Sequence, residues 1–167
     1  MSIKREYPDS HVVSLANQFC DAATFLHREK KTSGPQATKV NAAFAIELYI
    51  KSLACRWVHH KDSEIEGIAL GVVTSQSDLR GHELDELFKK LDTSTRDYLT
   101  KQFASHELKA KYGDLLSILC TFSVKFIRER YIFEHVEPVK PGELSDIVEL
   151  ALFFKAAVNS IERRRLG

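Results

Sequence analysis

The sequence predicts an all-α protein, an antiparallel helical bundle of four main helices with two short helices inserted between them. Two observations support this fold class. Apolar residues recur every three to four positions along most of the 167-residue chain, which is the spacing of helices that bury one face. No two segments alternate apolar and polar residues convincingly enough to predict a pair of strands. A chain of this length is expected to form a single domain, residues 1–167, around one core.

The first two main helices are predicted at about residues 10–31 and 36–60. Each holds apolar residues at helical spacing, so each is expected to bury one face. Asp9 or Ser10 is suited to cap the first helix, because a short oxygen-bearing side chain can accept from the free backbone N–H groups. A Thr-Ser-Gly-Pro turn separates the two helices.

Residues 61–81 are predicted to be an irregular loop, with at most a short extended piece at residues 68–73. The segment holds Gly67, Gly71 and Gly81 together with several serines and threonines, and it lacks helical spacing. Loops of this length are uncommon in compact domains and are often functional or disordered. The segment is therefore a candidate for a functional loop.

Two short helices are predicted next, the first opened by His82 and the second by Asp92. We expect His82 to be a helix-start residue rather than a catalyst. Earlier in the chain, Glu47 and Lys51 lie one helical turn apart, so they are expected to form an ion pair on a solvated face.

The last two main helices are predicted at residues 115–136 and at about residues 143–164. A Gly-Asp break precedes the first of them, and two prolines end it. The run of three arginines at residues 163–165 is expected to be the solvated, frayed end of the last helix.

Composition indicates an ordinary intracellular protein. The formal net charge is only +1, so any contact with phosphates must come from a local patch rather than from a global field. Cys20, Cys55 and Cys120 lie far apart among apolar neighbours and are expected to be buried, reduced thiols. We find no apolar signal core at the N-terminus and no apolar run long enough to span a bilayer, so we expect a soluble, cytoplasmic protein.

Five polar side chains gather at the end of the long helix: Arg128, Arg130, Tyr131, Glu134 and His135. Arg128 and His135 are seven residues apart, so they lie within about 20° of each other on a helix, with Tyr131 between them. An imidazole that moves a proton beside a guanidinium that holds a phosphate suits phosphodiester chemistry. The alternative is structural, because Arg130, Tyr131 and Glu134 can clamp this helix to the second one while His135 caps its end.

No motif in the sequence indicates a metal or a cofactor. The chain lacks HExxH, paired CxxC motifs, a P-loop, a dinucleotide fingerprint and a GxSxG elbow. We therefore predict neither a metal site nor a bound cofactor.

Three segments together resemble the HEPN superfamily, helical-bundle domains found in higher eukaryotes and prokaryotes. They are residues 41–53, residues 81–91 and residues 130–134, so the resemblance covers about residues 41–134. Active HEPN ribonucleases carry an arginine and a histidine separated by four to six residues. Four residues separate Arg130 from His135, and six separate Arg128 from His135, so either arginine fits.

The resemblance implies a homodimeric endoribonuclease that cleaves RNA without metal, by attack of the ribose 2′-hydroxyl on the adjacent phosphate. His135 would be the general acid/base, Arg130 or Arg128 would bind the phosphate, and Tyr131 and Glu134 would orient them. A toxin–antitoxin or phage-defence setting follows, with an antitoxin or nucleotidyltransferase-like partner. The alternative is a non-catalytic HEPN module that binds a nucleotide, RNA or a protein partner.

Overall fold

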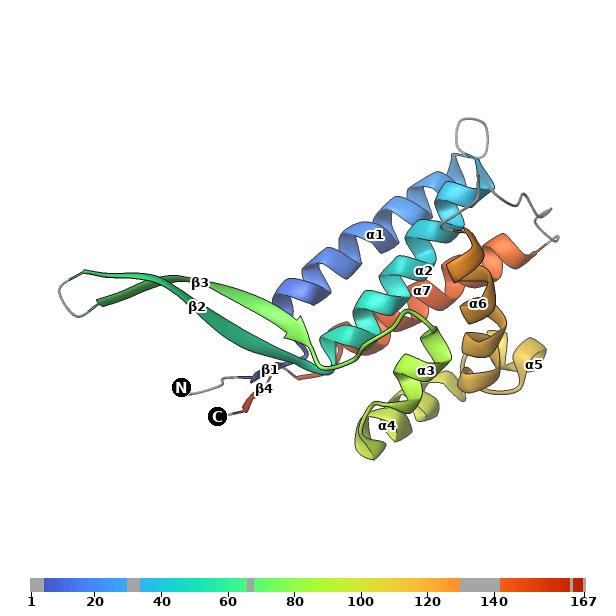
Figure 1. Ribbon diagram of the computed structural model, residues 1–167. Helices are drawn as coiled ribbons and strands as arrows, with labels where there is room; N and C mark the ends of the chain where they lie inside the picture. The colour runs from blue at the N-terminus through green and yellow to red at the C-terminus, as the bar shows by residue number, and fades with distance from the viewer. Residues whose placement is uncertain (1–4, 30–33, 66–67, 130–141, 163, 167) are drawn as a thin grey trace.

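The computed structural model describes residues 5–29, 34–65, 68–129, 142–162 and 164–166, and these are mainly helical, as predicted (Figure 1). The four longest helices are α1 (Ser10–Arg28), α2 (Pro35–Ser52), α6 (Leu115–Glu129) and α7 (Glu143–Asn159). The described residues form three shorter helices, rather than the two predicted: α3 (Leu84–Lys89), α4 (Thr93–Phe103) and α5 (Leu108–Tyr112). The strands of the described part are β1 (Arg5–Tyr7), β2 (Cys55–Ile65), β3 (Ile68–Ser77) and β4 (Arg164–Leu166).

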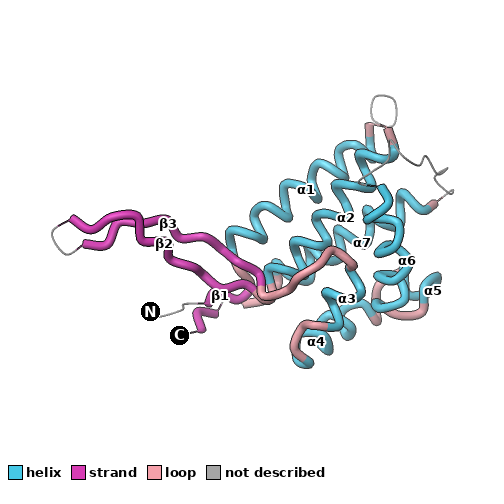
Figure 2. Tube along the Cα trace, viewed as in Figure 1, coloured by secondary structure: helices cyan, strands magenta, loops and turns pink. Residues whose placement is uncertain are grey.

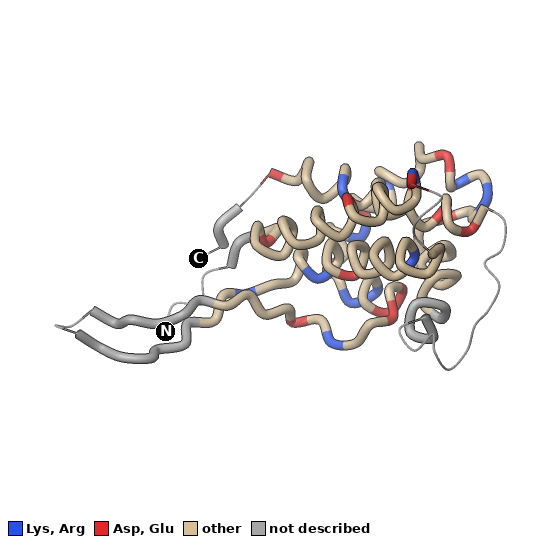
Figure 3. The backbone as a smooth tube through the Cα atoms, turned by 90° about the horizontal axis from the view of Figure 1, so that it is seen from above, with Lys and Arg blue, Asp and Glu red and all other residues tan. Residues whose placement is uncertain are grey.

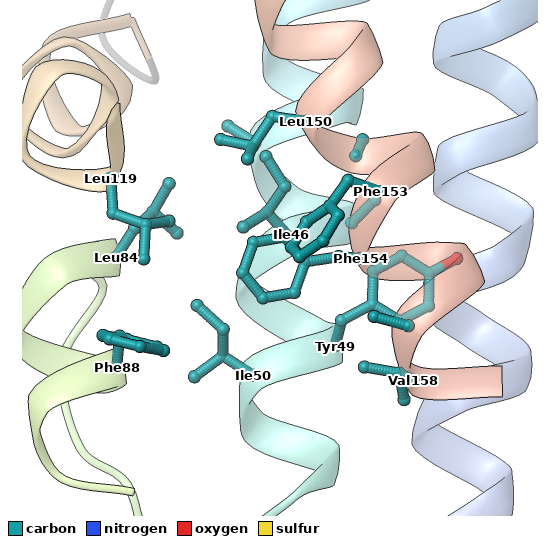
Figure 4. Close-up of a cluster of buried hydrophobic side chains, with 14 of the residues drawn as sticks. Ile46, Tyr49, Ile50, Leu84, Phe88, Leu119, Leu150, Phe153, Phe154 and Val158 are labelled. Carbon is teal, nitrogen blue, oxygen red and sulfur yellow. The ribbon is translucent and has the colours of Figure 1, made fainter. Parts of the chain in front are cut away.

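Helix α2 is the centre of the helical body. It contacts α1, α7, α3 and α6, and its buried residues lie on nearly every side. A helix that buries residues on nearly every side needs other elements around it, and these four helices supply them. Figure 4 shows how Ile46 and Ile50 of α2 join Phe154 of α7 and Leu84 of α3 in one apolar cluster. Whether these helices are arranged as in HEPN domains stays a prediction.

Strands β2 and β3 form an antiparallel hairpin that projects from the helices, and two sequence predictions are wrong here (Figures 1 and 2). Helix α2 ends at Ser52 instead of continuing to residue 60, and residues 61–81 are not an irregular loop, since β3 extends to Ser77. The paired positions run from Cys55 opposite Ser77 to Ile65 opposite Ile68. β-Branched residues and the tryptophan of this segment suit a pleated strand.

A second small sheet joins the two ends of the described chain. β1 pairs antiparallel with β4, with Arg5 opposite Leu166 and Tyr7 opposite Arg164. The arginines of β4 therefore lie in a strand whose backbone groups pair with β1. The prediction of a frayed helix end is wrong for this part of the arginine run. Helix α7 ends at Asn159, earlier than predicted.

Asp9 ties α1, α2 and the hairpin together. Its carboxylate is fully buried and accepts from the backbone N–H of Val12 at 3.0 Å, which makes Asp9 the N-cap of α1 as predicted. The other carboxylate oxygen accepts from Trp57 Nε1 at 3.0 Å and Ser75 Oγ at 2.8 Å. The backbone N–H of Asp9 donates to the carbonyl of Ser52 at 2.9 Å. One side chain thus fixes the base of the hairpin.

Other sequence predictions can be compared with the described residues. Gly113 caps the end of α5 with a φ of 82°, and Asp114 accepts from the N–H of Ser117, so the predicted break before α6 is confirmed. Cys20 and Cys55 are buried and free as predicted, but Cys120 is exposed, because α6 turns other residues toward the core. None of the helices in the described ranges is long and apolar enough to cross a membrane.

Candidate functional site

The predicted catalytic cluster lies mostly beyond what the structure describes. Arg130, Tyr131, Glu134 and His135 fall in residues 130–141, which are outside the described residues. Arg128 lies in the helical backbone of α6, and its side chain is likewise outside the description. The proposed pairing of these five residues, and the choice between Arg128 and Arg130, therefore stay predictions.

The described part of α6 is held against the start of α3. The backbone N–H of Asp85 donates to Ser123 Oγ at 3.0 Å, and Ser123 is only 2% exposed. Burial alone would raise the pKa of the Asp85 carboxyl, but hydrogen bonds from Ser123 and Lys89 outweigh it and lower that pKa to about 2. Asp85 is therefore ionised at neutral pH, and its charge lies where the start of α3 meets Ser123 of α6.

A buried carboxylate forms the clearest polar site of the described residues. Glu47 of α2 is 2% exposed, and its Oε1 accepts from Lys51 Nζ at 2.7 Å and contacts His82 Nδ1 at 2.9 Å. The predicted Glu47–Lys51 pair is confirmed, but its position on a solvated face is wrong, because the side chains of Lys51 and Glu47 are only 17% and 2% exposed. The side chain of His82 is 51% exposed, so its ring links the buried carboxylate to solvent.

This arrangement can orient a proton-transfer group. Glu47 Oε1, which accepts from Lys51, is also the acceptor in the contact with His82, so Nδ1 is the ring nitrogen that carries the donated proton. The other ring nitrogen, Nε2, is then an acceptor in the neutral ring and a donor in the imidazolium. A carboxylate that fixes one ring nitrogen of a histidine and leaves the other accessible is a common arrangement in acid–base chemistry.

Sequence reasoning did not pair His82 with Glu47. The sequence predicts only a helix-start role for His82, and His82 does lie next to Glu83, the N-cap of α3. The partners are 35 residues apart, and no spacing rule connects residues across that distance. The available signal was the resemblance to HEPN domains, since Glu47 lies in its first segment and His82 in its second.

A second ionic cluster fixes the start of α7. Lys39 of α2 contacts Glu143 of α7 at 3.4 Å, and both side chains are nearly buried. Asp146 accepts from Tyr112 Oη at 2.6 Å and also from Lys111. Burial, and then the neighbouring Asp146 carboxylate, raise the pKa of the Tyr112 hydroxyl. These contacts place α7 relative to α2 and α5.

Within the described ranges, no three His, Cys, Asp or Glu side chains gather closely enough to hold a metal ion. Comparisons of this chain with protein-family models, with curated proteins and with solved structures found no match. The site must therefore be interpreted from its own residues.

Proposed function

We propose that this protein is a metal-independent endoribonuclease of the HEPN type that acts as a homodimer. The contact between Glu47 and His82 supports this function most directly, because it joins two of the three segments that resemble HEPN domains. The third segment starts at residue 130, directly after α6, and α6 packs on both α2 and α3. The first two segments therefore lie in parts of the fold that contact each other. The third segment directly follows α6 in the chain, and α6 contacts both of those parts.

The proposed reaction is transesterification within the RNA strand. His135 acts as the general acid/base, and Arg130, or Arg128 in its place, holds the phosphate as negative charge grows on it. Tyr131 and Glu134 orient these groups. The 2′-oxygen loses its proton and bonds to phosphorus, the bond from phosphorus to the 5′-oxygen breaks, and that oxygen takes up a proton. The products end in a 2′,3′-cyclic phosphate and a 5′-hydroxyl.

The charge distribution agrees with a local phosphate site. Figure 3 shows lysines and arginines interspersed with aspartates and glutamates along the described helices. With a net charge of +1, such a surface gives little general attraction for nucleic acid. The proposal therefore assigns phosphate binding to the arginines near residue 130, doubled when two copies face one cleft. A toxin–antitoxin or phage-defence role with a nucleotidyltransferase-like or other antitoxin partner belongs to the same proposal.

A non-catalytic HEPN module that binds a nucleotide, RNA or protein partner is the second candidate. One observation favours it: Glu47 and Ser123, the buried polar groups of this region, hold helices together through His82 and the backbone of Asp85. Contacts of this kind are what a scaffold without catalysis would also need.

RNA cleavage in the presence of a metal chelator tests the proposal. We expect the wild type to cleave single-stranded RNA and leave cyclic phosphate ends. His135→Ala should lower the rate by at least about 100-fold, the usual contribution of a general acid/base. Arg130→Ala or Arg128→Ala should lower it as well, and the variant that loses more activity identifies the phosphate-binding arginine.

Two exposed residues of α1 provide matched controls. His11→Ala and Arg28→Ala remove the same side-chain types from exposed positions outside the predicted cluster, and both should cleave RNA at the wild-type rate. Equal activity in all variants would contradict the assignment and indicate a contaminating nuclease. A wild type that binds RNA or a nucleotide without cleaving it would support the non-catalytic module.

The dimer is tested separately by the mass in solution. One chain has a mass of 19.0 kDa, and the proposal expects twice this value at the concentrations at which RNA is cleaved. A protein that cleaves RNA as a monomer would keep the ribonuclease assignment and remove the shared cleft.

A further inference from the structure

A cavity of about 300 Å³ opens where the start of α4, strand β1 and the end of α7 meet. Its wall consists mainly of hydroxyl side chains, contributed by Tyr7, Ser94, Thr95, Tyr98 and Ser160, and Glu162 also lines it. None of these residues belongs to the predicted catalytic cluster. The positions of the hydroxyl protons determine what kind of ligand such a wall can bind.

On the α4 side, the hydroxyl protons of Ser94 and Thr95 are directed at Asp92, the N-cap of α4. Asp92 Oδ1 accepts from Ser94 Oγ at 2.5 Å, and Oδ2 accepts from Thr95 Oγ1 at 2.6 Å. Burial would raise the pKa of Asp92, but these hydrogen bonds outweigh it and lower that pKa, so the carboxylate is ionised and only accepts. Because the single hydroxyl proton of Thr95 is used there, Tyr7, at 2.6 Å, must donate to Thr95.

On the α7 side, the hydroxyl protons are also used within the protein. Ser160 Oγ donates to the carbonyl of Ala157 at 2.8 Å. Tyr98 lies 3.1 Å from the same carbonyl and 2.8 Å from Ser160 Oγ, so its proton has an acceptor in either direction. Whichever of these arrangements holds, neither hydroxyl has a proton left for a ligand.

The wall therefore offers oxygen lone pairs and a negative charge. Glu162 is exposed, and it forms no ion pair or hydrogen bond with any other residue that the structure describes. Asp92 lies just behind Ser94 and Thr95, where it offsets the positive end of the α4 dipole. An anion or a carbonyl group in this cavity would face oxygen lone pairs, and no hydroxyl group would donate a hydrogen bond to it. A group rich in N–H bonds would instead find oxygen acceptors for its hydrogen bonds.

We propose that this cavity binds an alkylammonium or guanidinium group, with Glu162 as its counter-ion and the oxygens of Ser94, Tyr98 and Ser160 as further acceptors. The aromatic ring of Tyr98 adds the attraction of a π-face for a cation, and Ile161 offers an apolar surface for an alkyl chain. A volume of about 300 Å³ is at the small end of ligand pockets, so the cavity suits a single side chain or a short polyamine. The cation is therefore either a free polyamine or a lysine or arginine side chain of a protein partner.

Nuclear magnetic resonance titration with four small probes of similar size tests the ligand class. Butylammonium and butylguanidinium carry the proposed group, whereas butanol is neutral and butyrate is an anion. We expect the two cations to shift the amide signals of Ser94–Tyr98 and Ser160–Glu162, and the other two probes to leave them unchanged. Shifts of equal size with butyrate, or no shifts with the cations, would overturn the proposal.

Charge-removing variants test the site itself. Glu162→Gln should weaken cation binding at least about tenfold, the loss expected when one charge-assisted hydrogen bond is removed. Glu107→Gln is the matched control, because Glu107 is also exposed and lies at the start of α5. Tyr98→Phe should weaken binding less. Equal weakening by Glu162→Gln and Glu107→Gln would indicate unspecific attraction and contradict the site.

The source of the cation is decided by comparing spermidine with a lysine blocked at both its amino and carboxyl groups. Tighter binding of blocked lysine would assign the cavity to a side chain of a protein partner. Tighter binding of spermidine would assign it to a free polyamine. Binding of neither compound, like the absence of shifts with the small cations, would overturn the proposal.

Discussion

Replacing Asp9 with alanine is expected to destabilise the protein by about 3 kcal/mol, far more than an ordinary loss of a helix cap. The reason is that this carboxylate serves three elements at once. It caps α1 through Val12, and it accepts from Trp57 of β2 and Ser75 of β3 while being fully buried. Its removal leaves the base of the hairpin without its attachment to the helices.

The magnitude follows from the individual contacts. A lost N-cap is worth about 1 kcal/mol. Each of the two hydrogen bonds from the hairpin to the charged group is worth about 1.5 kcal/mol, the lower end of the range for charged acceptors. Part of this total is regained, because the variant no longer keeps a carboxylate away from water. The remaining loss should lower the melting temperature by roughly 6–12 °C in a chain of this size.

Asp92→Ala is the matched control. Asp92 is also an N-cap and also accepts three hydrogen bonds, but it is exposed and its partners Ser94 and Thr95 are its near neighbours in sequence. Its loss should destabilise the protein by about 1 kcal/mol, as for an exposed cap. The two variants thus differ mainly in burial and in the distance along the chain that the contacts span.

Denaturant unfolding should be followed by circular dichroism, which reports the helices, and by tryptophan fluorescence. Trp57 is the only tryptophan of the chain, so its emission reports the base of the hairpin alone. We expect Asp9→Ala to shift this emission to longer wavelength before global unfolding, and Asp92→Ala to leave it unchanged. Unfolding free energies that agree within about 0.5 kcal/mol for the two variants would refute this reasoning.

Three further predictions concern the core, pH and the thiols. Ile46→Ala, in the fully buried centre of α2, should reduce the free energy of unfolding by about 2–5 kcal/mol, whereas Leu15→Ala at a partly exposed position should cost less than about 1 kcal/mol; similar losses would contradict the central place of α2. The pKa of Asp85 is lowered from 3.8 to about 2, so its contribution is present above pH 3.8 and is lost as pH falls toward 2. Its partner Lys89 is 42% exposed, so screening by water limits this effect to less than about 1 kcal/mol. Asp85→Asn should flatten the acid limb of stability measured against pH, and an unchanged limb would contradict it. Cys120 should react with a thiol reagent in the folded protein while the two buried cysteines react only on unfolding, so labelling of all three without denaturant would be the contrary result. Because burial and the nearby Asp85 raise the pKa of the Cys120 thiol, Asp85→Asn should also speed its labelling.

Local patterns in the sequence predict the helices well. Asp9 was identified as a candidate cap of α1, and the Gly-Asp break before α6 was placed correctly. The pair formed by Glu47 and Lys51 was also expected. All three features depend on residues within four positions of one another, and at that range backbone geometry fixes which groups meet.

The hairpin shows where local patterns fail. Leu53, Ala54 and Trp57 fit a helical spacing, so α2 was predicted to continue to residue 60. A strand is stabilised only when a partner strand satisfies its backbone groups, and Cys55 finds its partner at Ser77. The competition between helix and hairpin is therefore decided by pairing across more than twenty residues, which no short window of sequence contains.

Some features of the polar sites can also be predicted from the sequence, whereas others depend on the tertiary structure. The amino-acid order alone is enough to assign a mainly helical chain and to identify the arginine and histidine near residue 130 as candidates for phosphate chemistry. The burial of Glu47, its contact with His82 and the direction of each hydroxyl proton around Tyr98 arise only when distant segments fold together. The physical reason is that burial and long-range hydrogen bonds are properties of the assembled core, whereas helix formation depends largely on neighbours along the chain.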